Sequence, residues 1–347
     1  MPTFVTGASG YLGKQVVRRL ANAGGRVHTL VRKTSNLNGL AHRNIHIFYG
    51  NLEDKNSIIE AMKGCQRVYH IAALVARWHP DPAQFDLANV KGSRNVFEAA
   101  LDLNVDKLVY TSSVMALGSS GETPADETHQ RSGRFVNDYE RTKYQAEIEF
   151  GEMLGRGLPG VAVSPSLIYG PSINYPGSLT NRLIKQFIEG KLKALPNAGA
   201  KKGNGVYIED VVTGHFLAMD KGKVGEKYIL GGENLTLDQF IALMSVAFKI
   251  KRKVWKIPLS ILWGLGFIDE IKARLKGTQP EYPRSFAKIY GHSWAYSSEK
   301  AKRELGYQSR TLREGLKITH AWLTGQPLPP PSPSDLLGPQ YRPIQLN

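Results

Sequence analysis

The chain has 347 residues, which at about 150 residues per domain is enough for two domains, each with a core of its own. The single cysteine, Cys65, excludes an internal disulfide bond and any metal site built from several cysteines. The net charge of +15 favours anionic partners, but no zinc-finger spacing or stacking aromatics accompany the basic residues, so we expect no nucleic-acid partner.

The sequence carries no sign of a membrane span or a secretory leader. No apolar run approaches the roughly 18 residues of a transmembrane helix, and the first residues lead directly into a glycine-rich turn. We therefore expect a cytoplasmic protein. Basic residues are densest over 191–202 and 249–256, where they form either a solvated face or a surface that attracts a phosphate-bearing cofactor or an anionic surface.

Short β-branched segments alternate with helical ones through the first half of the chain. Strands are predicted over residues 4–6, 26–31, 45–49, 68–72, 107–111 and 160–164. Helices are predicted over residues 10–23, 56–62, 89–103 and 137–154. This alternation is typical of right-handed βαβ units, so we expect an α/β fold with a Rossmann-type, doubly wound parallel sheet covered on both faces.

From about residue 170 the pattern loosens. Helices are predicted over residues 179–189, 210–219, 237–248 and 259–275, and a strand over 226–230. We expect a dinucleotide-binding domain over 1–170, to which elements from about 205–235 return, and a smaller, mixed substrate lobe over 171–325. Residues 326–347 form a proline-rich tail, which we expect to be extended or disordered.

A glycine triplet lies between the first predicted strand and the first predicted helix. Gly7 permits a tight turn, Gly10 lets the backbone approach a pyrophosphate, and Gly13 lets the helix pack closely on the strand. The free N–H groups and the dipole of the helix N-terminus favour an anion there. The turn therefore predicts dinucleotide binding.

The end of the second predicted strand bears on the choice of cofactor. A carboxylate at this place would bind the ribose hydroxyls of NAD, but the chain carries Arg32 and Lys33 instead. Either cation can pair with a 2′-phosphate, so we favour NADP(H). NAD(H) remains the alternative if both cations are only solvated.

Tyr139 and Lys143 share one face of a predicted helix because they are four residues apart. Reducing a carbonyl by hydride transfer requires a proton donor at the oxygen, and the reverse reaction requires a base. A free tyrosine has a pKa near 10, and a neighbouring ammonium lowers it by favouring the phenolate. At the end of the fifth predicted strand, Thr111, Ser112 and Ser113 offer hydroxyls that can orient the carbonyl and stabilise the developing oxyanion.

Taken together, these residues resemble the extended short-chain dehydrogenase/reductase superfamily over about residues 1–324. The segments that carry the resemblance are 6–13, 50–54, 70–73, 89–95, 110–113, Tyr139 with Lys143, 165–171 and 300–307. Within it, segments 112–118, 225–234 and 292–297 resemble the dihydroflavonol-4-reductase-like branch, close to farnesol-dehydrogenase-like and hopanoid-associated sugar-epimerase-like proteins.

The resemblance implies roles for individual residues. Ser113 takes the place of the catalytic serine, Tyr139 that of the general acid/base, and Lys143 that of its partner. Cofactor contacts are implied for Gly7, Ser9, Gly10, Tyr11, Leu12, Gly13, Arg32, Lys33, Asn51, Leu52, Ala72, Ala73, Leu74, Asn89, Thr111, Ser112, Pro165 and Ile168. Asn51 departs from the aspartate usual in the family, which weakens one adenine contact. Many relatives form homodimers through two helices, here residues 89–103 and 137–154.

Substrate contacts are expected from loops at the carboxyl ends of the strands and from the second lobe. The candidates are Val75, Trp78, Met115, Phe135, Asn174 and Tyr175. The apolar segment 257–268 forms a core helix, a hydrophobic lid or a face that touches a membrane. The histidines lack ligand spacing, so no metal is expected, and His70 in its strand is interpreted as buried and hydrogen-bonded.

Three functions remain open. The first is an NAD(P)(H)-dependent oxidoreductase acting on an apolar carbonyl or alcohol of flavonoid, prenyl, steroid or phenylpropanoid type. The second is a nucleotide-sugar epimerase or dehydratase with tightly held cofactor. The third is a non-catalytic protein that uses dinucleotide binding for assembly, against which the complete set of Ser113, Tyr139 and Lys143 argues.

Overall fold

The computed structural model describes residues 1–173 and 178–328. Its largest element is a seven-stranded sheet in the order β10-β6-β5-β4-β1-β2-β3, in which every neighbouring pair is parallel. The strands are β1 (Thr3–Thr6), β2 (Val27–Val31), β3 (Ile45–Tyr49), β4 (Arg67–His70), β5 (Lys107–Thr111), β6 (Gly160–Pro165) and β10 (Lys227–Leu230). Every strand expected from the sequence is present, and the doubly wound fold is confirmed.

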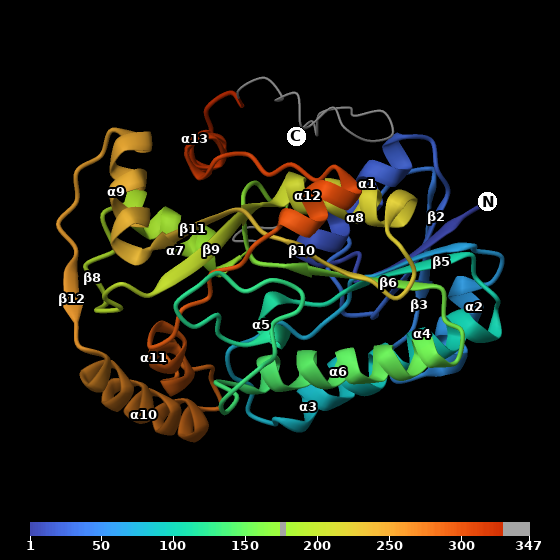
Figure 1. Cartoon of the computed structure of the whole chain (residues 1–347), viewed down its shortest axis with the longest axis horizontal. Coiled ribbons are helices and arrows are strands. Elements are labelled where there is room, and N and C mark those ends of the chain that lie inside the picture. Colours follow the sequence, from blue (N-terminus) through green and yellow to red (C-terminus); the bar gives the residue numbers. More distant parts are fainter. Residues whose placement is uncertain (174–177, 329–347) are drawn as a thin grey trace.

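Helices cover both faces of this sheet (Figure 1). One face carries α2 (Lys55–Met62), α4 (Gly92–Asp102) and α6 (Asp138–Gly155), whose apolar residues share a core cluster with those of β4 and β5. The other face carries α1 (Tyr11–Asn22), α8 (Ile208–Lys221) and α12 (Glu299–Leu305). The strand order reverses between β1 and β4, and in sheets of this kind ligands bind outside the carboxyl ends of the strands at such a reversal.

A smaller lobe extends from one end of the large sheet, at the left of Figure 1. In it β9 (Lys202–Tyr207) pairs parallel with β7 (Leu167–Tyr169) and antiparallel with β11 (Glu233–Thr236), and β8 (Ala194–Pro196) pairs with β12 (Trp255–Ile257). Its helices are α7 (Leu179–Ile188), α9 (Leu237–Phe248), α10 (Leu259–Lys276), α11 (Arg284–Tyr290) and α13 (Leu312–Leu323). The mixed strand directions agree with the expected mixed lobe.

One helix starts earlier than its sequence suggests. The pattern predicts a helix from Asn89, but the helical backbone begins with α3 (Ala83–Phe85) and runs through a π-helix, η1 (Asp86–Lys91), into α4. Pro82 precedes it, and proline is tolerated at a helix start because the first N–H groups have no helical partner. The wider π turn turns Asn89 inward, where its side chain is fully buried.

Within the described part of the chain, no helix combines the length and the apolar character needed to cross a membrane. Over the same residues, no group of three or more histidine, cysteine, aspartate or glutamate side chains is placed to hold a metal ion.

Candidate active site

The turn between β1 and α1 contains three glycines, and at two of them, Gly7 and Gly13, a side chain would not fit. A Cβ atom on Gly7, which has φ of +77°, would lie 2.7 Å from the backbone nitrogen of Ala72. A Cβ atom on Gly13 would lie 2.2 Å from the carbonyl oxygen of Gly7. Gly10 closes the turn, since its N–H donates to the same Gly7 oxygen over 2.9 Å. The turn therefore brings β1, α1 and the end of β4 into direct backbone contact.

The N-terminus of α1 is open to an anion. Gly10 is its N-cap residue, and no side chain caps it. The first backbone N–H groups of a helix point out along its axis, so this cradle fits the pyrophosphate of a dinucleotide. The side chains that follow face elsewhere: the Tyr11 hydroxyl donates to the Gly170 oxygen over 2.8 Å, and Leu12 lies in the core. Ser9 is half-buried in the turn itself.

The residues expected around the adenosine follow β2 and β3. Arg32 and Lys33 are exposed directly after β2, next to β1, and within the described residues neither makes a salt bridge. Asn51 is exposed after β3, and Leu52 is half-buried with its carbonyl accepting a hydrogen bond from the Asn95 amide over 2.7 Å. All four therefore lie at the carboxyl edge of the sheet, as predicted.

The loop after β4 is held in place by a buried asparagine. The Leu74 N–H donates to the Asn89 carboxamide oxygen over 2.7 Å, and the Asn89 amide nitrogen donates to the Leu74 carbonyl over 3.2 Å. The same nitrogen donates to the Thr142 hydroxyl of α6 over 3.0 Å. Asn89 thus positions the loop that carries Ala72 and Ala73, and its own amide is occupied by these partners.

His70 is buried and hydrogen-bonded through both ring nitrogens. The Ser93 hydroxyl donates to the Asn89 carbonyl over 2.6 Å, so it accepts from the Nε2–H of His70 over 2.9 Å. The Nδ1 atom then accepts from the Thr6 hydroxyl over 2.8 Å. Burial lowers the pKa of His70 to about 3, so the ring stays neutral. This geometry confirms the structural role expected for His70.

Ser113 and Tyr139 meet at the carboxyl end of β5. Ser113 caps the short helix α5 (Val114–Leu117), and its hydroxyl accepts from the Met115 N–H over 3.2 Å. Tyr139 lies in the first turn of α6 and is half-buried. Burial raises the pKa of the Tyr139 hydroxyl, and its hydrogen bond with Ser113 acts in the opposite direction. The Tyr139 side chain of α6 is therefore paired with Ser113 at the carboxyl end of β5.

Lys143 lies one helical turn after Tyr139 and is almost completely buried. Its Nζ donates to the Tyr110 hydroxyl and to the Thr111 carbonyl, each over 2.9 Å. Burial lowers the pKa of Lys143 to about 7, and the Glu147 carboxylate opposes that shift. The Lys143 amino group is thus tied to the end of β5, two residues before Ser113.

The hydroxyls of Thr111 and Ser112 point to opposite faces of the sheet. The Thr111 hydroxyl bonds the Nε2 atom of the buried His215 on α8 over 2.9 Å. The Ser112 hydroxyl donates to the Glu147 carboxylate of α6 over 2.5 Å, and Glu147 also pairs with Lys227. The hydroxyls of Thr111 and Ser112 are therefore already hydrogen-bonded within the protein.

Sequence reasoning missed two members of this cluster, Tyr110 and Glu147. Side chains alternate along a strand, so Tyr110 and Ser112 must share the face that packs against α6. On α6, Glu147 lies four residues after Lys143 and so on the same side of the helix. Combining the alternation of side chains along the strand with the four-residue spacing along the helix would have identified Tyr110 and Glu147.

The residues predicted to contact the nicotinamide and the substrate come from β6, β7, α5 and the loop after β4. Pro165 is buried at the end of β6, Ile168 is half-buried on β7, and Met115 is half-buried on α5. Val75 is exposed and Trp78 half-buried in the loop after β4. Asn174 and Tyr175 lie outside the described residues.

Phe135 is held over α6 by a buried ion pair that the sequence did not indicate. The Arg131 guanidinium pairs with the carboxylate of Glu140, the neighbour of Tyr139, and lies 3.8 Å from the centre of the Phe135 ring. The other Glu140 oxygen accepts the Val136 N–H over 2.5 Å. This pair fixes the loop that carries Phe135 next to the first turn of α6.

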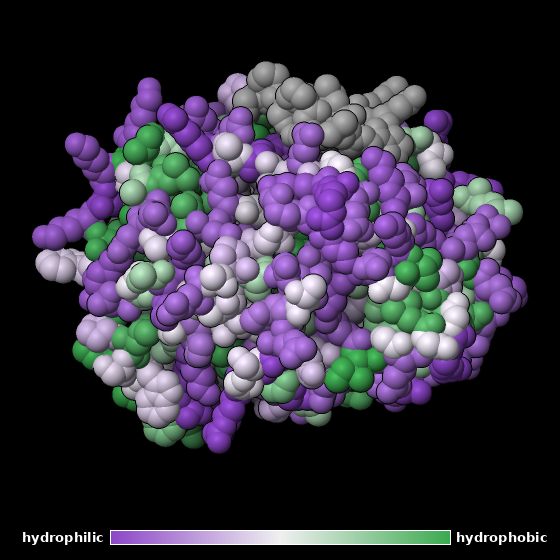
Figure 2. All heavy atoms as spheres, viewed as in Figure 1, coloured by the Kyte–Doolittle hydropathy of each residue, from purple (hydrophilic) through white to green (hydrophobic). Residues whose placement is uncertain are grey.

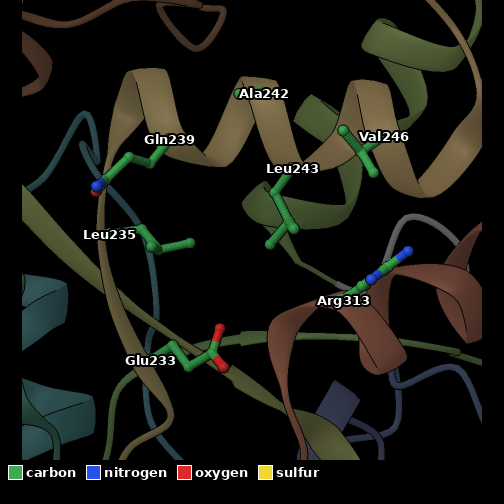
Figure 3. Close-up of a pocket in the computed structure, with 7 residues that line it drawn as sticks. All are labelled: Glu233, Leu235, Gln239, Ala242, Leu243, Val246 and Arg313. Carbon is green, nitrogen blue, oxygen red and sulfur yellow. The ribbon is translucent and has the colours of Figure 1, made fainter.

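A separate groove of about 390 Å³ lies between β11, α9 and α13 (Figure 3). Figure 3 shows Leu235 and Leu243 facing each other across it, with Glu233 and Arg313 on its lower side. It contains none of the residues predicted for the cofactor or the substrate, so it is distinct from the Ser113–Tyr139 cluster.

Comparison with known proteins settles the family. Residues 3–231 match the model of the NAD dependent epimerase/dehydratase family. The chain belongs to this family. The match spans the glycine turn, Ser113, Tyr139 and Lys143, and it confirms the resemblance to extended short-chain dehydrogenases/reductases.

Relatives of this epimerase/dehydratase-family chain include proteins named as a reductase and as a sterol demethylase protein. It is 31% identical to a putative dihydroflavonol 4-reductase of Synechocystis, over 92% of this chain and 93% of the relative. It is 32% identical to sterol demethylase protein B of Methylococcus capsulatus, over 93% and 98%. The crystal structure of gox2253 superposes with a TM-score of 0.80 at 37% identity, over 93% of this chain and 98% of the other. The chain is thus an enzyme of an NAD-dependent oxidoreductase family.

Proposed function

We propose that the protein reduces an apolar carbonyl compound, or oxidises the corresponding alcohol, with NADP(H). The observation that carries this is the juxtaposition of Ser113 at the end of β5 with Tyr139 in the first turn of α6, four residues before the buried Lys143, whose Nζ donates to the Thr111 carbonyl over 2.9 Å. The nicotinamide cofactor, when bound, supplies or accepts the hydride. The rest of the chemistry belongs to side chains of this chain.

In this proposal Tyr139 donates the proton during reduction and accepts it during oxidation. As the carbonyl carbon becomes an alcohol carbon, its oxygen takes the proton of the Tyr139 hydroxyl, and Ser113 donates a hydrogen bond to the same oxygen. In the reverse direction the Tyr139 phenolate removes the alcohol proton. In its protonated form Lys143 would favour that phenolate by its charge. Burial raises the pKa of Tyr139, and its hydrogen bond with Ser113 lowers it.

The cofactor would be held along the carboxyl edge of the large sheet. The backbone of the Gly7–Gly13 turn would bind the pyrophosphate, and Arg32 with Lys33 would pair with a 2′-phosphate. Ala72 and Ala73, fixed through Asn89, would lie along the nicotinamide ribose. In this scheme residues 1–170 serve the dinucleotide, and the lobe over 171–325 serves the substrate.

Apolar side chains favour an apolar substrate. In this proposal Val75, Trp78, Met115 and Phe135, which come from loops and from α5, line the substrate site, and none of these side chains carries a charge or a carboxamide for binding a sugar. Two relatives also bear the names of apolar ring compounds, a dihydroflavonol and a sterol. A flavonoid, prenyl, steroid or phenylpropanoid ketone therefore fits better than a nucleotide sugar.

The substitution Tyr139→Phe tests the proton donor. It keeps the ring and removes only the hydroxyl, so kcat/KM for the ketone should fall about 10²–10⁴-fold while the thermal shift with NADP(H) is unchanged. Tyr144→Phe, on the next half-buried tyrosine of α6, is the matched control and should keep activity. Equal activity of both variants, or turnover of a nucleotide sugar instead of a ketone, would contradict the proposal.

Arg32→Ala tests the cofactor preference. Losing a charge-assisted contact of about 1.5–3 kcal/mol should weaken NADP(H) binding roughly tenfold to a hundredfold and leave NAD(H) binding unchanged. Arg26→Ala is the control, because Arg26 is exposed before the opposite end of β2. Titration calorimetry with each dinucleotide measures both constants. A wild-type protein that binds only NAD(H) would overturn the preference.

We further propose a homodimer through α4 and α6. Their outer surface carries Arg94, which pairs with Glu98 of its own helix and with Glu149 of α6. Ile148 is exposed on the same helix pair. Sedimentation of wild type and Ile148→Lys tests this arrangement, since the variant should shift a dimer toward the monomer.

A further inference from the structure

Helix α10 exposes apolar side chains on the face opposite its buried stripe. Its buried residues, Leu262, Gly266, Glu270 and Ala273, recur at helical spacing along one side. On the opposite side and its flanks, the residues that are between 44% and 82% exposed are Ile261, Trp263, Leu265, Phe267, Ile268, Ile271 and Leu275. A helix on the surface of a soluble protein normally turns polar residues outward, so this face is suited to a partner.

The helix is firmly attached through its buried stripe. Gly266 lies so close to α11 that a Cβ atom would be 2.7 Å from the Tyr282 carbonyl oxygen. The Glu270 carboxylate accepts the backbone N–H of Arg284 over 2.8 Å and its Nε–H over 2.9 Å. The exposed apolar face is therefore the outer side of an ordered α10–α11 hairpin.

Cations flank this apolar face. Lys272, Arg274 and Lys276 lie in the second half of α10, and in the described part of the chain none of them makes a salt bridge. Just before the helix, the exposed Trp255 on β12 has the Nζ of Lys253 4.4 Å from its ring centre. Tryptophan beside lysine and arginine is the composition that membrane–water interfaces favour. In Figure 2, the lower-left rim, where Figure 1 places α10, shows green and pale side chains with purple ones projecting beside them.

We propose that the outer face of α10, with the basic residues beside it, docks on the surface of a bilayer that contains anionic lipids. A second copy of the chain is the poorer occupant of this face, because the same cations of α10 would then meet across the contact. Anionic headgroups complement that charge, and the acyl region receives the apolar side chains. The charged residues of α10 keep it in the plane of the interface.

Docking through α10 would bring the bilayer next to the loop after β4, which carries two of the residues predicted to contact the substrate. The Ser285 hydroxyl of α11 donates to the Arg77 carbonyl over 3.2 Å, and the Arg77 guanidinium lies 4.9 Å from the centre of the Phe286 ring. Arg77 belongs to the loop after β4 that also carries Val75 and Trp78. An apolar substrate would then enter from the membrane, a step that rests on the proposed function.

Flotation of the full-length protein with vesicles tests the docking. Phosphatidylcholine vesicles with phosphatidylglycerol should bind the protein, and pure phosphatidylcholine vesicles should bind it much more weakly. Ile268→Glu and Leu275→Glu should each reduce partitioning about tenfold or more. Lys272→Gln and Lys276→Gln should each reduce binding to anionic vesicles about fivefold. Val224→Glu, equally exposed in the turn before β10, is the matched control and should bind like wild type.

Three results would overturn the proposal. They are absence of wild-type binding to anionic vesicles, unchanged binding of Ile268→Glu, and a dimer that Ile268→Glu dissociates without any vesicle binding by wild type. The last result would assign the face to a second copy of the chain. Tyr139→Phe should float like wild type, so a failure of the proposed chemistry leaves the docking result intact.

Discussion

Lys143 is a buried cation whose protonation must respond to folding. Burial lowers its pKa from the usual 10.5 to about 7 in the folded protein. Between these values the unfolded chain binds the extra proton and the folded chain does not. The free energy of unfolding should therefore rise with pH from about 7 to 10.5, by up to about 1.4 kcal/mol per pH unit from this one group.

The variant Lys143→Met should lose that pH dependence. Melting temperatures of both proteins without cofactor at pH 6 and pH 9 provide the measurement. The stability of wild type relative to Lys143→Met should be higher at pH 9 than at pH 6, because the cost of burying an ammonium is lost as pH rises. The exposed Lys63→Met is the control and should follow wild type at both values. A constant difference between wild type and Lys143→Met would contradict a lowered pKa.

The sequence alone indicated the side chains of Tyr139 and Lys143, but it did not indicate the residues that hydrogen-bond to Lys143. The four-residue spacing placed Tyr139 and Lys143 on one helix face, and both lie there. The hydrogen bonds of the Lys143 Nζ go to Tyr110 and Thr111, which are more than 30 positions away, and only the packing of α6 on β5 brings them together. Local spacing cannot report a contact that depends on tertiary packing.

Among the elements, the junction of β1 and α1 depends on the absence of a side chain at Gly13. Gly13→Ala would place a Cβ atom 2.2 Å from the Gly7 carbonyl oxygen, so α1 has to move away from the turn. We expect a loss of about 1–3 kcal/mol in stability and weaker dinucleotide binding. Gly151→Ala is the matched helical control: nothing lies within 4 Å of its added Cβ atom, and the change should stabilise α6 by about 0.5–1 kcal/mol.

Urea denaturation and cofactor titration of both glycine variants measure these effects. Equal stability of Gly13→Ala and wild type would show that the turn adapts, and the argument for close backbone contact would be wrong. Retained dinucleotide affinity in a destabilised Gly13→Ala would separate packing from binding.

One strand that the sequence failed to indicate, β9, consists mostly of residues that do not favour a strand. β9 contains two glycines, a lysine and an asparagine, all of which are depleted in strands. It forms because β7 and β11 flank it on both sides, and β11 lies about 30 residues further along the chain. The strands of the large sheet, rich in valine and isoleucine, were predictable from composition alone.

For the whole molecule, a buried ion pair ties the C-terminal helices to the central fold. The Arg310 Nε and Nη2 donate to one Asp210 oxygen over 2.9 and 2.8 Å, and the Arg310 N–H donates to the other over 2.8 Å. The guanidinium also lies 4.0 Å from the centre of the Tyr207 ring. This contact joins α8 to the segment that leads into α13.

Arg310→Met should cost about 3–5 kcal/mol in stability, because it leaves the Asp210 carboxylate buried without its cation. Lys302→Met, which breaks an exposed pair with Glu299, is the control and should cost at most about 1 kcal/mol. Chemical denaturation of both variants compares the two pairs. Similar losses in both would show that burial adds nothing to the Arg310 pair.

The α10–α11 hairpin leaves and rejoins the lobe at neighbouring places. It departs from β12, which pairs with β8, and returns at Trp294, which bridges to Gly203 on β9. No strand of the seven-stranded sheet lies within this excursion. The hairpin therefore contributes no strand to the seven-stranded sheet, and a change in its length or in its apolar side chains alters the lobe without interrupting the register of the parallel strands.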